Sequence, residues 1–124
     1  MTQYLDLELL LLVADEAGLQ AVRDPGLLDS AAHRPRTTVF GEDAYPTLDE
    51  KAAVLLESIV RNHPLVDGNK RLGWLATVLL YRLNGVRLDA PEDPAYDLVI
   101  GIAEGRIDYH ASAARLASWT STPT

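Results

Sequence analysis

The stretch NHPLVDGNKRLGW, residues 62–74, decides how this chain folds. Pro64 and the Asp67-Gly68 pair interrupt a helical pattern, so the stretch predicts a connection between two helices. Within nine positions it also gathers a histidine, a carboxylate, an amide and two cations, at His63, Asp67, Asn69, Lys70 and Arg71. The stretch is therefore both a helix–helix connection and a concentration of chemically active side chains.

Helical periodicity continues on both sides of this connection. Before it, residues 47–50 (TLDE) form a capping box that starts a helix with one apolar stripe, and His63 is expected to continue that stripe. After it, a helix begins near Asn69 and stops at Asn84-Gly85. The second helix is apolar almost all round, so it is expected at the centre of the fold.

The other segments predict four further helices and few other elements. The helices are expected over residues 6–18, 26–33, 94–105 and 109–119. Residues 34–46 break the pattern and predict a loop, a flap or a short hairpin, and residues 121–124 are expected to fray. The prediction is an all-α, compact single domain over residues 1–124, with about six helices around a central buried one.

Composition excludes several classes of function. The chain has 124 residues, a formal net charge of -7 and no cysteine. The negative charge argues against broad nucleic-acid binding, and the lack of cysteine excludes disulfides, thiol catalysis and cysteine-bound zinc. The uncharged run Leu9–Ala14 is far shorter than the roughly 20 apolar residues of a membrane span. We therefore expect a cytoplasmic protein with neither a membrane nor a nucleic acid as direct partner.

The start of the second helix predicts an anion site. The first backbone N–H groups of a helix have no intrahelical partner, and the helix dipole is positive there. Gly68 lets the backbone turn and lets a ligand approach closely. Lys70 and Arg71 occupy a first turn where the dipole disfavours cations, which indicates that they serve a bound phosphate.

Asp67 and His63 add a metal ligand and a base to this anion site. A carboxylate beside a polyphosphate is a natural ligand for Mg²⁺. A histidine titrates near neutral pH and can accept a proton from an incoming hydroxyl. Each residue alone has an ordinary structural explanation, but the combination favours phosphoryl or nucleotidyl transfer. His33 and His110 have no comparable polar residues near them in the sequence, so both are expected to be structural or surface residues. Trp74 and Trp119 are expected in the core.

The motif HPLVDGNKR resembles the Fic/Doc signature, HxFx(D/E)(G/A)N(G/K)R. It looks most like the death-on-curing (Doc) branch, because Lys70 stands where AMP-transferring Fic proteins usually have glycine. The resemblance extends through RLNGVRL, residues 82–88, and GIAEGRID, residues 101–108. It implies the helical Fic fold and a toxin of a toxin–antitoxin pair.

In this branch the resemblance implies a protein kinase that transfers the ATP γ-phosphate to a threonine of translation elongation factor Tu. His63 would be the general base and Asp67 would hold Mg²⁺. The phosphates would be held by Gly68, Asn69, Lys70 and Arg71. A flap at residues 36–45 would line the target protein by strand-like pairing. The antitoxin would be a small protein whose tail folds into a helix near the active site.

The chain departs from the family pattern at two positions, which keeps alternatives open. Leu65 replaces the usual phenylalanine and is expected to pack into the core. Gly68 stands where the Doc branch often has alanine, which is more like the Fic branch. The alternatives are AMP transfer to a protein hydroxyl and a non-catalytic helical interaction module. No inhibitory Fic helix motif is found in the chain, so inhibition is expected from a separate antitoxin.

Overall fold

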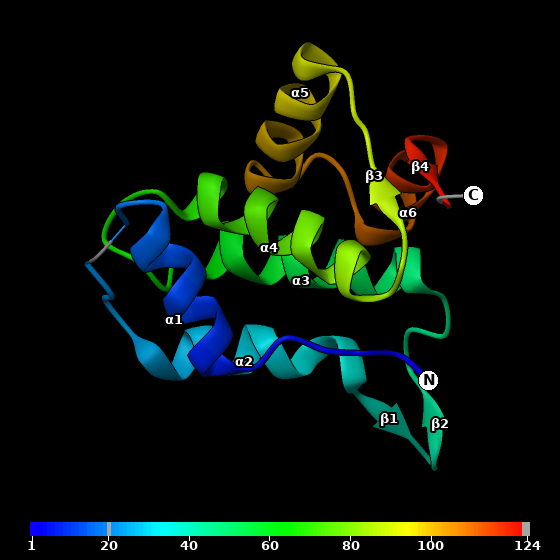
Figure 1. Ribbon diagram of the computed structural model, residues 1–124, viewed down its shortest axis with the longest axis horizontal. Coiled ribbons are helices and arrows are strands. Elements are labelled where there is room, and N and C mark those ends of the chain that lie inside the picture. The colour runs from blue at the N-terminus through cyan, green and yellow to red at the C-terminus, as the bar shows by residue number, and fades with distance from the viewer. Residues whose placement is uncertain (20, 123–124) are drawn as a thin grey trace.

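The computed structural model describes residues 1–19 and 21–122 as a helical bundle (Figure 1), which confirms the all-α prediction. The helices are α1 (Leu7–Glu16), α2 (Pro25–His33), α3 (Leu48–Asn62), α4 (Asn69–Leu83), α5 (Glu92–Ala103) and α6 (Tyr109–Ser118). A 3₁₀ turn, η1 (Arg34–Arg36), follows α2. The short strands are β1 (Thr38–Val39), β2 (Glu42–Asp43), β3 (Arg87–Leu88) and β4 (Thr120–Ser121).

Local caps explain where most helices begin. Asp6, Asp24 and Asp108 accept hydrogen bonds from backbone N–H groups in the first turns of α1, α2 and α6. At α3, the Thr47 hydroxyl accepts from the Glu50 N–H at 3.1 Å and donates to the Glu50 carboxylate at 2.9 Å. The Thr47 half of the predicted capping box is therefore confirmed, whereas Glu50 reaches back to the Thr47 hydroxyl in place of its N–H.

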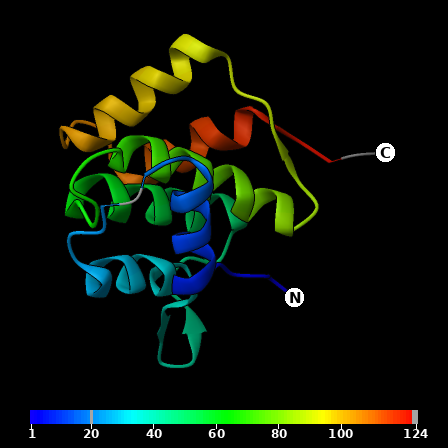
Figure 2. The same ribbon diagram turned by 60° about the vertical axis from the view of Figure 1, so that its left-hand side comes forward.

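α3 and α4 run antiparallel through the middle of the bundle, with α1 and α2 on one side and α5 and α6 on the other (Figures 1 and 2). The helix after the motif, α4, is at the middle as predicted, but α3 is the more deeply buried of the two. Every residue of α3 from Lys51 to Leu56 is buried, whereas Leu83 of α4 is exposed. The reason is that α3 packs against α2, α4, α5 and α6, and α4 keeps part of its surface free.

A second small sheet fixes the C-terminal region. β3 and β4 are antiparallel, with Arg87 opposite Ser121 and Leu88 opposite Thr120. The Asp89 N–H also donates to the Trp119 carbonyl at 2.9 Å. The prediction that the chain frays from residue 121 is therefore wrong for Ser121, and residues 123–124 lie outside the described part. Among the described helices, none combines the length and the apolar character that a membrane span requires.

Candidate active site

All the residues predicted for the site lie where α3 passes into α4, at one end of both helices (Figure 2). His63 is the C-cap of α3, and Gly68 is the N-cap of α4. Asn69 is buried, whereas the side chains of His63, Asp67, Lys70 and Arg71 are exposed. The structure thus brings the predicted base, carboxylate and cations together on one accessible connection.

His63 does not continue the apolar stripe of α3, which corrects the prediction. Its backbone has φ 53° and ψ 59°, the left-handed conformation, and its side chain is exposed. Pro64 gives the physical reason, because a residue before proline is disfavoured in the right-handed helical conformation. Histidine is among the residues that tolerate the left-handed conformation better. The imidazole therefore leaves the helix surface and joins the loop.

Arg23 holds the end of α3 from outside the motif. Its Nε donates to the His63 carbonyl at 2.8 Å, and its second guanidinium nitrogen donates to the Asn62 carbonyl at 2.9 Å. The last carbonyls of a helix lack intrahelical partners, so the guanidinium acts as a C-terminal cap. Sequence reasoning missed Arg23, because it lies forty positions before His63 and belongs to no recognisable motif.

The linker between α1 and α2 runs against the motif loop and forms a single β-bridge with it. The N–H groups of Arg23 and Asp24 donate to the Pro64 carbonyl at 2.8 and 3.0 Å. The Val66 N–H donates to the Ala21 carbonyl at 2.8 Å, and Val22 is bridged to Leu65. Residues 21–24 therefore form the wall of the site on the α2 side.

Asn69 holds the same loop from the opposite side. Its Oδ1 accepts from the Leu65 N–H at 2.9 Å, and its Nδ2 donates to the Leu65 carbonyl at 3.0 Å. The same Nδ2 lies 3.4 Å from Nδ1 of His63. The Asn69 side chain thus shapes the loop, while its backbone N–H stands at the start of α4.

The start of α4 offers uncapped donors and positive charge. Gly68, the N-cap, has no side chain with which to cap the helix, and within residues 1–19 and 21–122 no other side chain does so. Lys70 and Arg71 are exposed, and neither forms an ion pair in that part of the chain. Free helical N–H groups beside two cations suit an anion such as phosphate.

Asp67 is the carboxylate beside this anion site. Its Oδ1 accepts from the Gly68 N–H at 2.9 Å, and its side chain is exposed. The described residues contain no group of three or more acidic, histidine or cysteine side chains that could hold a metal. Mg²⁺ is commonly held by one or two carboxylates together with phosphate oxygens and water. Asp67 therefore fits Mg²⁺ that arrives with a nucleotide.

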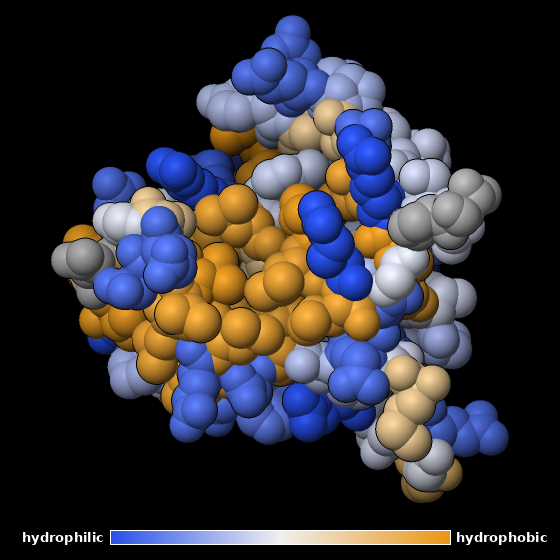
Figure 3. Space-filling model, in the orientation of Figure 1, coloured by the Kyte–Doolittle hydropathy of each residue, from blue (hydrophilic) through white to orange (hydrophobic). Residues whose placement is uncertain are grey.

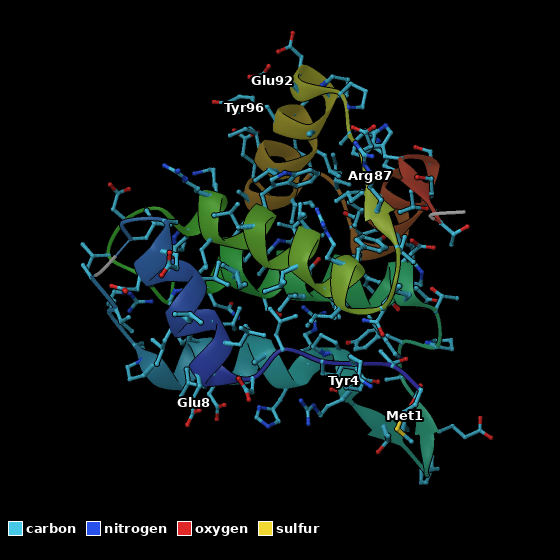
Figure 4. The ribbon with its side chains drawn as sticks, in the orientation of Figure 1. Met1, Tyr4, Glu8, Arg87, Glu92 and Tyr96 are labelled. Atoms are coloured by element: carbon cyan, nitrogen blue, oxygen red, sulfur yellow. The ribbon has the colours of Figure 1, made fainter. Side chains whose placement is uncertain are left out.

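One face of α4 leads from the anion site into a pocket. Lys70 and Trp74 are four residues apart, so they lie on the same helical face. Trp74 is half-buried and contributes to a pocket of about 370 Å³ between α4 and α5. Glu92 and Tyr96 also line it, and Figure 4 shows both at the outer end of α5. The expectation that Trp74 is a core residue is therefore only partly correct.

A second face of α4 leads from Arg71 into a groove against α1. Arg71, Leu75 and Leu79 follow one another at four-residue spacing on this face. The groove has a volume of about 500 Å³ and is completed by apolar residues of α1, Leu9, Leu12 and Val13 among them. Figure 3 shows a broad hydrophobic surface where α1 and α4 lie in Figure 1. Such a surface, rimmed by polar residues, is typical of a protein-interaction site.

The hairpin expected as a flap forms, but it does not lie at the site. β1 and β2 pair with Thr38 opposite Asp43 and Val39 opposite Glu42. The hairpin precedes α3, whereas the motif follows it, and the 15 residues of α3 separate the two by about 22 Å. The hairpin is therefore not beside His63, where residues 21–24 lie instead, and that residues 36–45 line a target protein stays a prediction.

Comparisons with known proteins agree with this geometry. Residues 4–81 match the Fic/DOC family, which is more than half of the chain. Toxin Doc of Mycolicibacterium smegmatis (strain ATCC 700084 / mc(2)155) is 48% identical over 125 residues, and the match spans 98% of this chain and 96% of that protein. This similarity confirms the death-on-curing branch that Lys70 indicates. The chain therefore belongs to the Fic/DOC family.

Proposed function

We propose that this protein is the toxin of a toxin–antitoxin pair and a protein kinase that transfers the ATP γ-phosphate to a threonine of elongation factor Tu, which blocks translation. The observation that carries the proposal is the meeting of His63, Asp67 and the uncapped start of α4 in one connection. The similarity to a Doc toxin supports the toxin role.

The proposed step is an in-line phosphoryl transfer. The threonine hydroxyl oxygen forms a bond to the γ-phosphorus, the bond to the β–γ bridging oxygen breaks, and ADP leaves. The hydroxyl proton passes to the His63 imidazole. Such a transfer depends mainly on positioning and on charge stabilisation. The N–H groups at the start of α4, with Lys70 and Arg71, would hold the phosphates, and Mg²⁺ beside Asp67 would neutralise their charge.

The pocket between α4 and α5 supports a nucleotide as phosphate donor. Trp74 and Tyr96 offer aromatic faces for stacking a base, and Glu92 offers a carboxylate that could accept from an exocyclic amino group. Trp74 lies about one helical turn beyond Lys70, which is about 6 Å along the axis. A base in this pocket and phosphates at the helix start are compatible with one bound ATP.

Two alternatives are weaker. Gly68 suggested AMP transfer, but its φ of 85° and its closeness to Leu19 account for a glycine on structural grounds alone. Lys70 in place of glycine then favours phosphate over AMP transfer. Leu65 suggested a relic motif, but its side chain is buried at 1% exposure and reaches the core that a phenylalanine would fill. The replacement therefore changes packing and leaves the chemically active side chains in place.

The groove between α1 and α4 is the proposed dock for the antitoxin tail. An amphipathic helix binds such a groove through apolar side chains spaced three or four residues apart. Leu12, with 53% of its surface exposed, lies in the groove, and Arg71 stands at its end. A tail in this groove would place an acidic side chain on Arg71 and so compete with phosphate.

Intact-mass spectrometry of elongation factor Tu tests the proposal. After incubation with this protein, ATP and Mg²⁺, the target should gain one phosphate. The gain should be lost in His63→Ala and in Asp67→Ala, and retained in His110→Ala, which removes an exposed histidine outside the site. A gain of one AMP would favour the Fic reaction. If no gain is seen and cells still stop growing with His63→Ala, the protein acts as an interaction module.

A further inference from the structure

Arg23 lies outside the motif, and its side chain bonds directly to the backbone of the proposed base, His63. Its guanidinium donates to the carbonyls of Asn62 and His63 at 2.9 and 2.8 Å. Its own backbone N–H donates to the Pro64 carbonyl at 2.8 Å. Arg23 thus contacts three consecutive carbonyls on the loop that carries the imidazole.

His63 needs such support because its backbone conformation is unfavourable for a side chain. With φ 53° it is one of two non-glycine residues with positive φ among the described residues, the other being Phe40 at the hairpin tip. A left-handed residue persists only where its surroundings determine it. Around His63 those surroundings are Pro64, which disfavours helix continuation, and the two bonds from Arg23.

The two guanidinium bonds fix direction as well as position. A guanidinium is a planar fork, so two bonds from one fork set the orientation of the two carbonyls relative to each other. The carbonyls of Asn62 and His63 belong to the two peptide planes on either side of the His63 Cα, so holding both planes fixes where Cβ points. Asn69 then meets the ring from the other side, with Nδ2 3.4 Å from Nδ1. Two side chains therefore contact His63. Arg23 bonds its backbone carbonyl, and Asn69 lies beside its imidazole ring.

We propose that Arg23 is a positioning residue that sets the direction of the His63 imidazole for proton transfer. The inference rests on the proposed role of His63 as base. Within residues 1–19 and 21–122, Arg23 forms no hydrogen bond or ion pair with the start of α4, so it should affect turnover and leave nucleotide affinity nearly unchanged. If Arg23 only stabilised the fold, its replacement would lower the melting temperature without changing the NMR signals of the His63 imidazole.

The experiment compares Arg23→Ala with Arg61→Ala. Arg61 is a matched control, because its guanidinium also donates to two backbone carbonyls, those of Ile102 at 2.8 Å and Ile107 at 3.3 Å. Two readouts are measured for each variant. One is steady-state phosphorylation of elongation factor Tu, and the other is the NMR spectrum of the imidazole groups. The protein has three histidines, so the signals of His33 and His110 are internal references.

For Arg23→Ala we expect kcat to fall by about tenfold to a hundredfold, with KM for ATP within about threefold of the native value. The His63 imidazole signals should shift or broaden, while those of His33 and His110 stay. Methylguanidinium should restore part of the activity. Arg23→Lys should recover only part, because an ammonium cannot donate as a fork. Arg61→Ala should leave the His63 signals and kcat close to native.

Three results would overturn the proposal. One is an unchanged His63 signal in Arg23→Ala. Another is a rise in KM with kcat retained, which would make Arg23 a nucleotide-binding residue. The third is an equal shift of His63 in Arg61→Ala. If Arg23→Ala does not fold, Arg23→Lys and Arg23→Gln replace it in the same comparison. If the native protein transfers no phosphate, the proposed function fails, and the imidazole spectrum still decides whether Arg23 positions His63.

Discussion

The Asn69 side chain satisfies both backbone groups of Leu65, accepting from its N–H at 2.9 Å and donating to its carbonyl at 3.0 Å. Both residues are buried, so water cannot replace these bonds. A single side chain therefore closes the loop that separates the proposed base from the proposed anion site. Asparagine suits this task because its amide carries one acceptor and two donors.

Asn69→Ala should lower the free energy of unfolding by about 2–3 kcal/mol, because it leaves a buried N–H and a buried carbonyl unsatisfied. Asn84→Ala is the control, since Asn84 bonds the N–H and the carbonyl of Gln3 at 2.7 and 2.9 Å and also the Leu80 carbonyl at 2.8 Å. Gln3 is exposed, so its groups gain water and only the Leu80 carbonyl loses a part-buried bond. The cost should therefore be lower, about 1 kcal/mol. Urea denaturation measures both. Equal losses would mean that the burial of the Leu65 bonds has no energetic consequence.

Gly68→Ala should lower the free energy of unfolding by about 1–2 kcal/mol, because residue 68 has φ 85°. An added Cβ would also meet Cδ2 of Leu19 at 2.6 Å. In a Leu19→Ala background the same substitution should cost less, since only the conformational part remains. The double-mutant cycle is measured by thermal or urea denaturation. A cost independent of Leu19 would show that the leucine moves aside freely.

Tyr81 should make the protein sensitive to alkaline pH. Its hydroxyl donates to Oδ1 of Asp49 at 2.6 Å, and burial, with this bond to a carboxylate, raises the pKa of the phenol. Above the ordinary tyrosine pKa of about 10, the unfolded chain loses this proton while the folded chain keeps it. Stability should therefore be complete below about pH 10 and fall as the pH rises further, by up to about 1.4 kcal/mol per pH unit.

The check is urea denaturation of the native protein and Tyr81→Phe from about pH 9 to about pH 11. The variant should begin about 1 kcal/mol or more less stable, because Asp49 loses its donor. Its stability should then decline less steeply with pH. Parallel curves for the two proteins would mean that Tyr81 ionises in the folded state as readily as in the unfolded chain.

Lys51 anchors the hairpin and should not affect the site. Its side chain is 1% exposed and donates to Oδ2 of Asp43 at 3.0 Å and to the Tyr45 carbonyl. Lys51→Met should cost about 2 kcal/mol, less than for a wholly buried pair, because the Asp43 side chain is 48% exposed and regains water. ATP affinity, measured by calorimetry, should stay native because the hairpin lies at the other end of α3. A weakened ATP affinity would contradict this separation.

The parts of the fold that follow from neighbouring residues were predictable. The starts of α1 and α3 depend on Asp6 and Thr47, whose side chains bond within their own first turns. The left-handed turn at Gly68 likewise depends on local sequence. The departure of His63 from the stripe was also encoded locally, by Pro64, and the rule for residues before proline would have found it.

The parts that depend on distant pairing were not predictable. Arg23 and the linker meet the motif loop across about forty positions, and a two-residue strand such as β4 carries no periodic pattern. The position of the hairpin far from His63, by contrast, could have been predicted, because the helix expected between residues 47 and 62 separates the two segments. Residue types therefore identified the candidate site, while its walls required the tertiary structure.

The pairing of residues 21–24 with residues 64–66 has a consequence for how the protein is made. The linker is synthesised before the motif, so the two can pair only after residues 64–66 have been made. A chain lacking residues 1–24 would lose the carbonyl contacts around His63 and also the core residues Leu5, Leu10 and Ala14. The candidate site is thus built from two segments about forty positions apart, so removal of the first 24 residues should abolish the proposed activity as completely as loss of the motif.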